Sequence, residues 1–288
     1  MIKVLSSKNY AVPTQNHGDC IIFIDGETAI IFDCGSEDHA KRAIDILNKN
    51  HIDKATVVLS HNDDDHFKGI PFLIDNGRVD KLFTILLLKY KDDILKEIDD
   101  GRRKPEPLAN DIIEMYDNIA SLSGKVKLCD VYEDEAEFPL QMQRVGPSFE
   151  YMIETVAKGL DSRESDKQDK ETITNAASVQ IQLTQSSKKI LLTGDCAPAA
   201  ISKDVDLNHF DYIQLPHHGK PATAGEIFER SGKNNEIVYI VSDNTGNSNG
   251  GSDGLITKGY RVQNTKNGDI NITLSGITTS YITTSLGI

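Results

Sequence analysis

The sequence predicts an α/β fold, because each half of the chain begins with paired strand-like segments and continues through helix and strand. Residues 20–25 and 29–33 are apolar runs on either side of Gly26-Glu-Thr, a pattern typical of a hairpin. Residues 39–50 carry apolar side chains at the spacing of one helical face. Residues 55–60 form a short apolar run, which predicts a buried strand after that helix.

The second half repeats this organisation after a helical and charged middle region. Its predicted strands are residues 178–183, 189–193, 212–215, 237–241 and 270–274. In the middle, residues 92–99 and 108–122 have helical periodicity, and residues 161–171 are polar enough to predict a solvated loop. Because no linker rich in Pro and Gly divides the chain, we expect one domain over residues 1–288, with an insertion at about 91–174.

Composition limits the classes of function. The 288 residues are 38% hydrophobic and 26% charged, as in an ordinary globular protein with a buried core. With 31 Lys and Arg against 44 Asp and Glu, the net charge is −13, which excludes a broad basic surface for duplex nucleic acid. No apolar run approaches the ~20 residues of a membrane span. The four cysteines form no C-x-x-C pair and no secretory signal is visible, so we expect a cytoplasmic protein without a membrane partner.

Residues 60–69 concentrate chemically active side chains directly after a predicted strand. This segment contains His61, Asp63, Asp65 and His66, and imidazoles and carboxylates are ligands of zinc and manganese. Three consecutive aspartates repel one another, and a bound cation removes this repulsion. The alternative interpretation is a solvated acidic turn without a metal.

Three later residues extend the candidate metal site. No histidine occurs from residue 67 to residue 208, and then His217 and His218 stand together after a predicted strand. Asp195 ends another predicted strand, from which its carboxylate could bridge two ions. Only one of the adjacent histidines need be a ligand, because neighbouring side chains of an extended segment point to opposite sides. The other could hydrogen-bond a substrate phosphate.

The order of these motifs resembles the metallo-β-lactamase superfamily, and within it the hydrolase domain of ComEC-type DNA-uptake proteins. The resemblance rests on Asp33, on H-x-D-x-D-H at 61–66, on Thr-Gly-Asp195 and on His217-His218-Gly219. Gly18-Asp19 before the first hairpin, Asn175-Ala-Ala-Ser178 and the late Thr265-Lys-Asn-Gly268 also fit that branch. The resemblance covers roughly residues 16–276 and implies a four-layer αββα sandwich.

The resemblance implies two divalent metal ions, zinc or manganese. One ion is expected on His61, Asp63 and the bridging Asp195. The other is expected on Asp65, His66, Asp195 and either His217 or His218, a choice the sequence leaves open. Asp33 is expected to orient a ligand histidine rather than to bind metal. Asp63 replaces a histidine of the common superfamily motif, and carboxylate ligands shift the metal preference toward manganese.

The implied function is hydrolysis of phosphodiester bonds by water that the two metal ions activate. Asp65, His217 and His218 are the expected catalytic residues. The substrate partner is expected to be an anionic phosphodiester, either a nucleotide or a short or single-stranded nucleic acid, with nuclease activity as one form of this function. A protein partner and the oligomeric state remain open. Hydrolysis of carboxylic esters, lactones or thioesters is the first alternative, and a non-catalytic, metal-stabilised binding module is the second.

For the other polar residues that stand out, we expect structural roles. His17, His39, His51 and His209 have no ligand-like spacing and are expected at the surface or in loops. Lys220 is expected to be a surface lysine. Cys196 is expected to pack in the core. Asn175 and Ser178 are expected to form a turn and to begin a strand.

Overall fold

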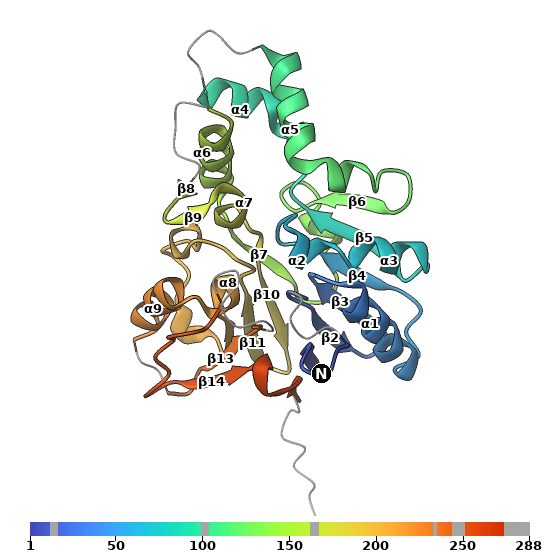
Figure 1. The fold of residues 1–288 in the computed structure, drawn as a ribbon, viewed down its shortest axis with the longest axis vertical. Helices are drawn as coiled ribbons and strands as arrows, with labels where there is room; N and C mark the ends of the chain where they lie inside the picture. Colours follow the sequence, from blue (N-terminus) through green and yellow to red (C-terminus); the bar gives the residue numbers. More distant parts are fainter. Residues whose placement is uncertain (12–16, 99–103, 162–166, 233–234, 244–250, 274–288) are drawn as a thin grey trace, which may run out of the picture.

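Two β-sheets face each other and helices cover their outer sides, which gives a four-layer αββα arrangement (Figure 1). The computed structural model describes residues 1–11, 17–98, 104–161, 167–232, 235–243 and 251–273. The first sheet has the order β15-β1-β2-β3-β4-β5-β6. Its strands are β1 (Ile2–Val4), β2 (Ile21–Asp25), β3 (Thr28–Phe32), β4 (Ala55–Val58), β5 (Val79–Thr84), β6 (Lys127–Asp130) and β15 (Ile270–Ile272).

The second sheet has the order β14-β13-β12-β11-β10-β7. Its strands are β7 (Gln143–Gly146), β10 (Gln180–Gln185), β11 (Lys188–Leu192), β12 (Tyr212–Gln214), β13 (Val238–Val241) and β14 (Arg261–Asn264). Each sheet contains an antiparallel hairpin, β2–β3 or β10–β11, whose second strand continues into three parallel strands. The α/β class and the repeated organisation of the two halves are therefore confirmed.

The helices differ in length and in what they cover. They are α1 (Glu37–Lys49), α2 (Asp64–Phe67), α3 (Ile70–Asp75), α4 (Lys91–Glu97), α5 (Pro105–Ala120), α6 (Phe149–Leu160), α7 (Ile173–Ala176), α8 (Pro216–Gly219) and α9 (Pro221–Arg230). Short 3-10 turns occur at Leu87–Tyr90, Glu135–Glu137, Pro198–Ala200, Leu207–His209 and Thr265–Asn267, and β8 (Lys167–Gln168) pairs with β9 (Glu171–Thr172). Within the described ranges, no helix has the length and apolar character to cross a membrane.

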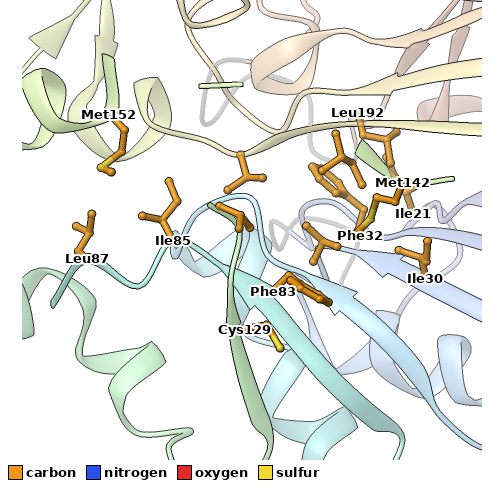
Figure 2. Packing of buried hydrophobic residues seen from close by; sticks show 14 of the residues in the cluster. Ile21, Ile30, Phe32, Phe83, Ile85, Leu87, Cys129, Met142, Met152 and Leu192 are labelled. Atoms are coloured by element: carbon orange, nitrogen blue, oxygen red, sulfur yellow. The ribbon is translucent and has the colours of Figure 1, made fainter. Parts of the chain in front are cut away.

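The strands are apolar on both faces because each sheet is covered on both sides. In β2, Ile21 and Phe23 enter the cluster between the sheets, whereas Ile22 and Ile24 enter the cluster under α1 and α3. This alternation follows from the two-residue period of a strand. Figure 2 shows the inter-sheet cluster, which includes Phe32 and Phe83 of the first sheet and Leu192 of the second. A third cluster fills the space between the second sheet and α9.

The middle region contributes strands as well as helices. The helices α4 and α5 lie near the predicted positions, with Asp99 outside the described residues. However, β6 and β7 lie within the expected insertion at 91–174, and each forms one edge of a main sheet. Their sequences, KLCD and QRVG, are too short and too polar to show a strand pattern. Of the last predicted strand, residues 270–272 are β15, and residue 274 lies outside the described residues.

The topology brings the sequence motifs to one edge. Strands β3, β4, β5 and β6 are parallel, so their carboxyl ends lie together, and residues 60–66 directly follow β4. In the second sheet, Asp195 follows β11, and His217 and His218 follow β12, which is parallel to β11. Hydrogen bonding from the Val179 amide to the Ser60 carbonyl, at 2.9 Å, joins the two sheets at this edge.

Truncation of the inter-sheet core should destabilise the whole fold. Phe83 is fully buried, and its ring lies 4.9 Å from that of Phe138. We expect Phe83→Ala to lower the free energy of unfolding by about 3–5 kcal/mol, because it removes apolar contacts and leaves a cavity. Urea denaturation followed by circular dichroism measures this change. Ile256→Ala, at a side chain that is 77% exposed, is the matched control and should change it by less than about 0.5 kcal/mol.

Candidate metal centre

Four buried side chains converge where the two sheets meet. Asp19, His66, Asp195 and His218 each offer one potential ligand atom, and these atoms all lie within 4.8 Å of one another. The His66 Nε2 atom is 3.3 Å from Asp195 Oδ1, and the His218 Nε2 atom is 3.6 Å from Asp195 Oδ2. Asp19 precedes β2 and His66 lies in α2, whereas Asp195 and His218 come from the second half of the chain. The cluster is therefore assembled from both halves.

His66 is held in a fixed orientation by a buried carboxylate. Its Nδ1 atom donates to Asp33 Oδ2 at 2.8 Å, and neither side chain is exposed. Asp33 also accepts hydrogen bonds from the Ser60 amide and from the Ser60 hydroxyl, both at 2.7 Å. Because Nδ1 points to Asp33, Nε2 is the ring nitrogen that faces Asp195.

His218 occupies a left-handed turn instead of the extended segment that the sequence predicted. His217 and His218 have φ values of 50° and 53°, a conformation that few residues other than glycine adopt. Gly194 and Gly219 also have positive φ, which lets the chain bend sharply beside Asp195 and after the histidine pair. The turn directs His218 toward the cluster, where its Nε2 atom is 3.1 Å from Asp65 Oδ2.

Asp19 reaches the cluster because two glycines allow close backbone approach. A Cβ atom on Gly18 would lie 1.6 Å from the Asp65 carbonyl oxygen, and one on Gly35 would lie 2.0 Å from the same atom. The Asp19 amide donates to that oxygen at 3.0 Å. The Asp19 carboxylate then accepts hydrogen bonds from Gln214 Nε2 and contacts His218 Nδ1 at 3.1 Å. Asp19 was not among the expected metal ligands, although the Gly18-Asp19 motif before the first hairpin pointed to this position.

His61 and Asp63 lie beside this cluster on a more open side. The Nδ1 atom of His61 is 2.9 Å from the Ser60 hydroxyl and 3.2 Å from the Ser178 hydroxyl, so Ser178 helps to orient His61. The Nε2 atom of His61 lies 3.6 Å from Asp63 Oδ2, and the Asp63 side chain is 45% exposed. The rings of His61 and His66 are 4.2 Å apart. The four-residue cluster does not include His61, Asp63, Asp65 or His217.

The donor atoms fit divalent metal ions. Within this site, three buried atoms make no hydrogen bond to the described residues: His61 Nε2, His66 Nε2 and Asp195 Oδ1. A buried polar atom without a partner costs about 1–3 kcal/mol, and divalent cations bound at this site would satisfy these three atoms. Imidazole nitrogen and carboxylate oxygen are ligands for zinc and manganese alike. The residues present therefore match the group that the sequence motifs imply.

The protein charges around the cluster are strongly interdependent. Burial lowers the pKa of His66, but the carboxylates of Asp195 and Asp33 outweigh it and hold that pKa well above its usual range. Burial raises the pKa of Asp65, but its hydrogen bond with His218 and the charge of His66 hold it below the usual range. In the protein alone, imidazolium protons thus balance buried carboxylates. A metal cation would take over this balancing charge.

A second group of charges surrounds His217, and it corrects two predictions. Glu171 was expected in a solvated loop, yet its side chain is 1% exposed. Its carboxylate accepts from His217 Nδ1 at 2.6 Å and from Lys220 Nζ at 2.8 and 3.0 Å, so Lys220 is paired with a buried acid rather than free at the surface. The strands β8 and β9 of this segment pair with each other and contact α7. Residues 162–166 of the predicted loop lie outside the described residues.

Two of the histidines expected at the surface or in loops are buried, and one of them, His17, does lie in a loop. His17 and His39 are 1% and 0% exposed, whereas His51 and His209 are exposed as expected. His39 faces inward from α1, with Nε2 at 3.1 Å from the Gly18 carbonyl and Nδ1 at 2.7 Å from the Tyr10 hydroxyl. Burial lowers the pKa of His39 to about 3, so it is neutral and braces the loop that carries Asp19. Cys196 is buried in the core, as predicted.

Comparison with known proteins gives structural similarity without detectable sequence similarity. No family model matches the chain, and no curated protein matches its sequence. The short form of human tRNase Z aligns with 83% of this chain and 92% of its own, at 13% identity and a TM-score of 0.42. YhfI of Bacillus subtilis, a metallo-β-lactamase fold protein, aligns over 83% and 84%, at 14% identity and a TM-score of 0.44.

A diphosphatase of the PhnP family aligns with 95% of this chain and 98% of its own, at 12% identity and a TM-score of 0.46. The fold of this chain is defined by its two facing sheets and by the helices on their outer sides. Its polar motifs lie at the strand ends where the two sheets meet. The chain therefore has the four-layer αββα arrangement that the sequence predicted.

Proposed function

We propose that this chain is a metal-dependent hydrolase of phosphodiester bonds that uses two divalent ions, zinc or manganese. The observation that carries this proposal is the set of three buried donor atoms without hydrogen-bond partners, on His61, His66 and Asp195. These atoms belong to side chains at strand ends, where α/β folds place ligand sites. Bound divalent ions would supply positive charge to phosphate oxygens and make water acidic enough to attack phosphorus.

The proposed ligands divide into two sets that share Asp195. Asp19, His66, Asp195 and His218 would hold one ion, because their ligand atoms already lie within 4.8 Å of one another. His61, Asp63 and Asp195 would hold the other, as the sequence predicted. Asp33 would act by orienting His66. This assignment adds Asp19 to the expected ligands, removes Asp65 from them and favours His218 over His217 in the adjacent pair.

The remaining polar side chains would handle substrate and protons. Asp65 contacts His218 and carries a negative charge, so it can accept a hydrogen bond from the attacking water and orient it. His217 donates a hydrogen bond from Nδ1 to Glu171, which fixes the orientation of its ring, and the imidazole would bind a phosphate or the leaving oxygen. Lys220, held by the same carboxylate, keeps a second cationic group close to His217.

The proposed substrate is an anion that enters a local cationic site in an acidic protein. The net charge of −13 disfavours long duplexes, which would have to lie across the negative exterior. The resemblance to ComEC-type domains supports short or single-stranded DNA as one candidate. The four cysteines are free and buried, which agrees with the reducing cytoplasm as the proposed compartment. Comparing bis(p-nitrophenyl) phosphate with a lactone and a thioester tests the reaction class, and faster turnover of either neutral substrate would contradict it.

Loss of the shared carboxylate should remove metal. We expect Asp195→Asn to retain at most half of the metal bound by the unaltered protein, because Asp195 would serve both ions. Elemental analysis after equilibrium dialysis against zinc or manganese measures this content. Asp53→Asn, at a side chain that is 88% exposed, is the control and should retain full metal. Full retention in Asp195→Asn would contradict the two-ion assignment.

The aspartate run offers a matched pair of variants for catalysis. We expect Asp65→Asn to lower kcat for bis(p-nitrophenyl) phosphate at least about a hundredfold, because the negative charge that orients water is removed. Asp64→Asn should leave kcat unchanged, since that side chain is 69% exposed and pairs with Lys68. Circular dichroism checks folding in both variants. Equal activity of the two variants would mean that the hydrolysis takes place at another site, without Asp65.

Glu171 should matter through His217 rather than through metal binding. We expect Glu171→Gln to lower kcat/KM about ten- to a hundredfold, because the amide no longer fixes the His217 tautomer or balances Lys220. Metal content, measured in the same preparation, should stay constant. Glu226→Gln is the control, because Glu226 makes only an exposed pair with Lys170. A parallel loss of metal in Glu171→Gln would show a structural role instead.

A further inference from the structure

An apolar groove runs between helix α5 and the segment that follows strand β5. Its volume is about 300 Å³, and residues of 85–89 and 112–128 form its walls. Leu88 and Ile113 stand on opposite walls and are 43% and 41% exposed. Large apolar side chains gathered around a concave surface are typical of a ligand site.

The run of apolar residues after β5 serves two purposes. Ile85 and Leu87 are buried in the inter-sheet cluster, as Figure 2 shows. Leu86 and Leu88 are more exposed and line the groove. The core therefore uses only part of this run. Leu88 is 43% exposed, so a large part of its apolar surface is open to a ligand that occupies the groove.

The groove adjoins the candidate metal centre. Strands β4 and β5 are parallel neighbours, so the metal motif after β4 and the groove segment after β5 leave the same edge, with a strand spacing of about 4.8 Å. Tyr116 lines the groove and packs against both the inter-sheet cluster and the cluster under α1 and α3. Burial raises the pKa of Tyr116 and the charge of Asp63 raises it further, so the phenol lies within electrostatic reach of the metal motif.

The walls of the groove suit a hydrocarbon better than a nucleobase or a phosphate. Apart from Tyr116, the polar side chains on the walls are Lys89 and Ser123. Lys89 donates to Glu133 Oε2 at 2.7 Å, so its charge is already balanced. Few groups are therefore placed to hydrogen-bond the edge of a base. We propose that this groove binds an alkyl or aryl substituent of the substrate, which makes small hydrophobic phosphodiesters, and not nucleic acid strands, the preferred substrates of the proposed phosphodiesterase.

The first test compares two diesters that share one leaving group. With the full, metal-loaded chain, kcat/KM for hexyl p-nitrophenyl phosphate should be at least about tenfold higher than for methyl p-nitrophenyl phosphate. The reason is that each buried methylene group should raise kcat/KM about fourfold. Leu88→Glu and Ile113→Glu should abolish this preference, measured as the ratio of the two kcat/KM values within each variant, so that an effect of the added charge on both diesters cancels. Ile256→Glu, at another exposed apolar residue, should keep the preference. A single-stranded oligonucleotide hydrolysed faster than the hexyl diester would overturn the proposal.

A binding measurement separates this inference from the proposed reaction. In calorimetric titrations, hexyl methylphosphonate should bind at least about tenfold more tightly than methyl methylphosphonate, and Leu88→Glu should remove the difference. Selective binding without hydrolysis of any diester would overturn the proposed reaction and keep the groove. Equal affinity for the two phosphonates would overturn the groove even in an active enzyme. A dimer that Leu88→Glu dissociates, seen by sedimentation, would assign the groove to a second copy of the chain and also overturn the proposal.

Discussion

The local structure around the site depends on keeping several carboxylates buried at one point. Asp19, Asp33 and Asp195 are almost completely buried, and such groups are tolerated only when opposite charge or donated hydrogen bonds compensate them. His66 and His218 supply that compensation, and they come from different halves of the chain. The backbone accepts unusual conformations to allow it, with a φ of 57° at Asp33 in addition to the left-handed histidine pair.

The two-sheet fold provides the setting for this arrangement. Each half brings a hairpin followed by parallel strands, so both halves present strand ends where the sheets meet. The apolar cluster between the sheets fixes their separation. The polar cluster lies beyond this apolar core, at the edge where the strands of both sheets end. Gly18 and Gly35 then allow the loop before β2 to lie directly against α2. The packing of the two sheets and the charge balance of the polar cluster therefore both require the loop before β2 to lie close to α2.

The surroundings of the cluster separate three chemical tasks. Buried aspartates and histidines are suited to hold cations, and the group of Glu171, His217 and Lys220 is suited to contact a phosphate. The groove beside α5 is apolar and lies next to the metal motif along the same sheet edge. An acidic surface and a local cationic site are compatible, because charge at a recessed site acts over short distances in salt solution. Together these features favour a small anion with an apolar part over a long polyanion.

By itself, the sequence determined the α/β class, the two hairpins, most of the central strands and the segments that carry His61, His66, Asp195 and His218. These features depend on local periodicity and on residue types that have few other uses at such density. The sequence did not reveal β6 and β7, because four-residue edge strands carry too few side chains to show a period. Only the tertiary structure decided that Asp19 joins the cluster, that His217 turns to Glu171 and that His39 is buried, because each depends on contacts between segments far apart in the chain.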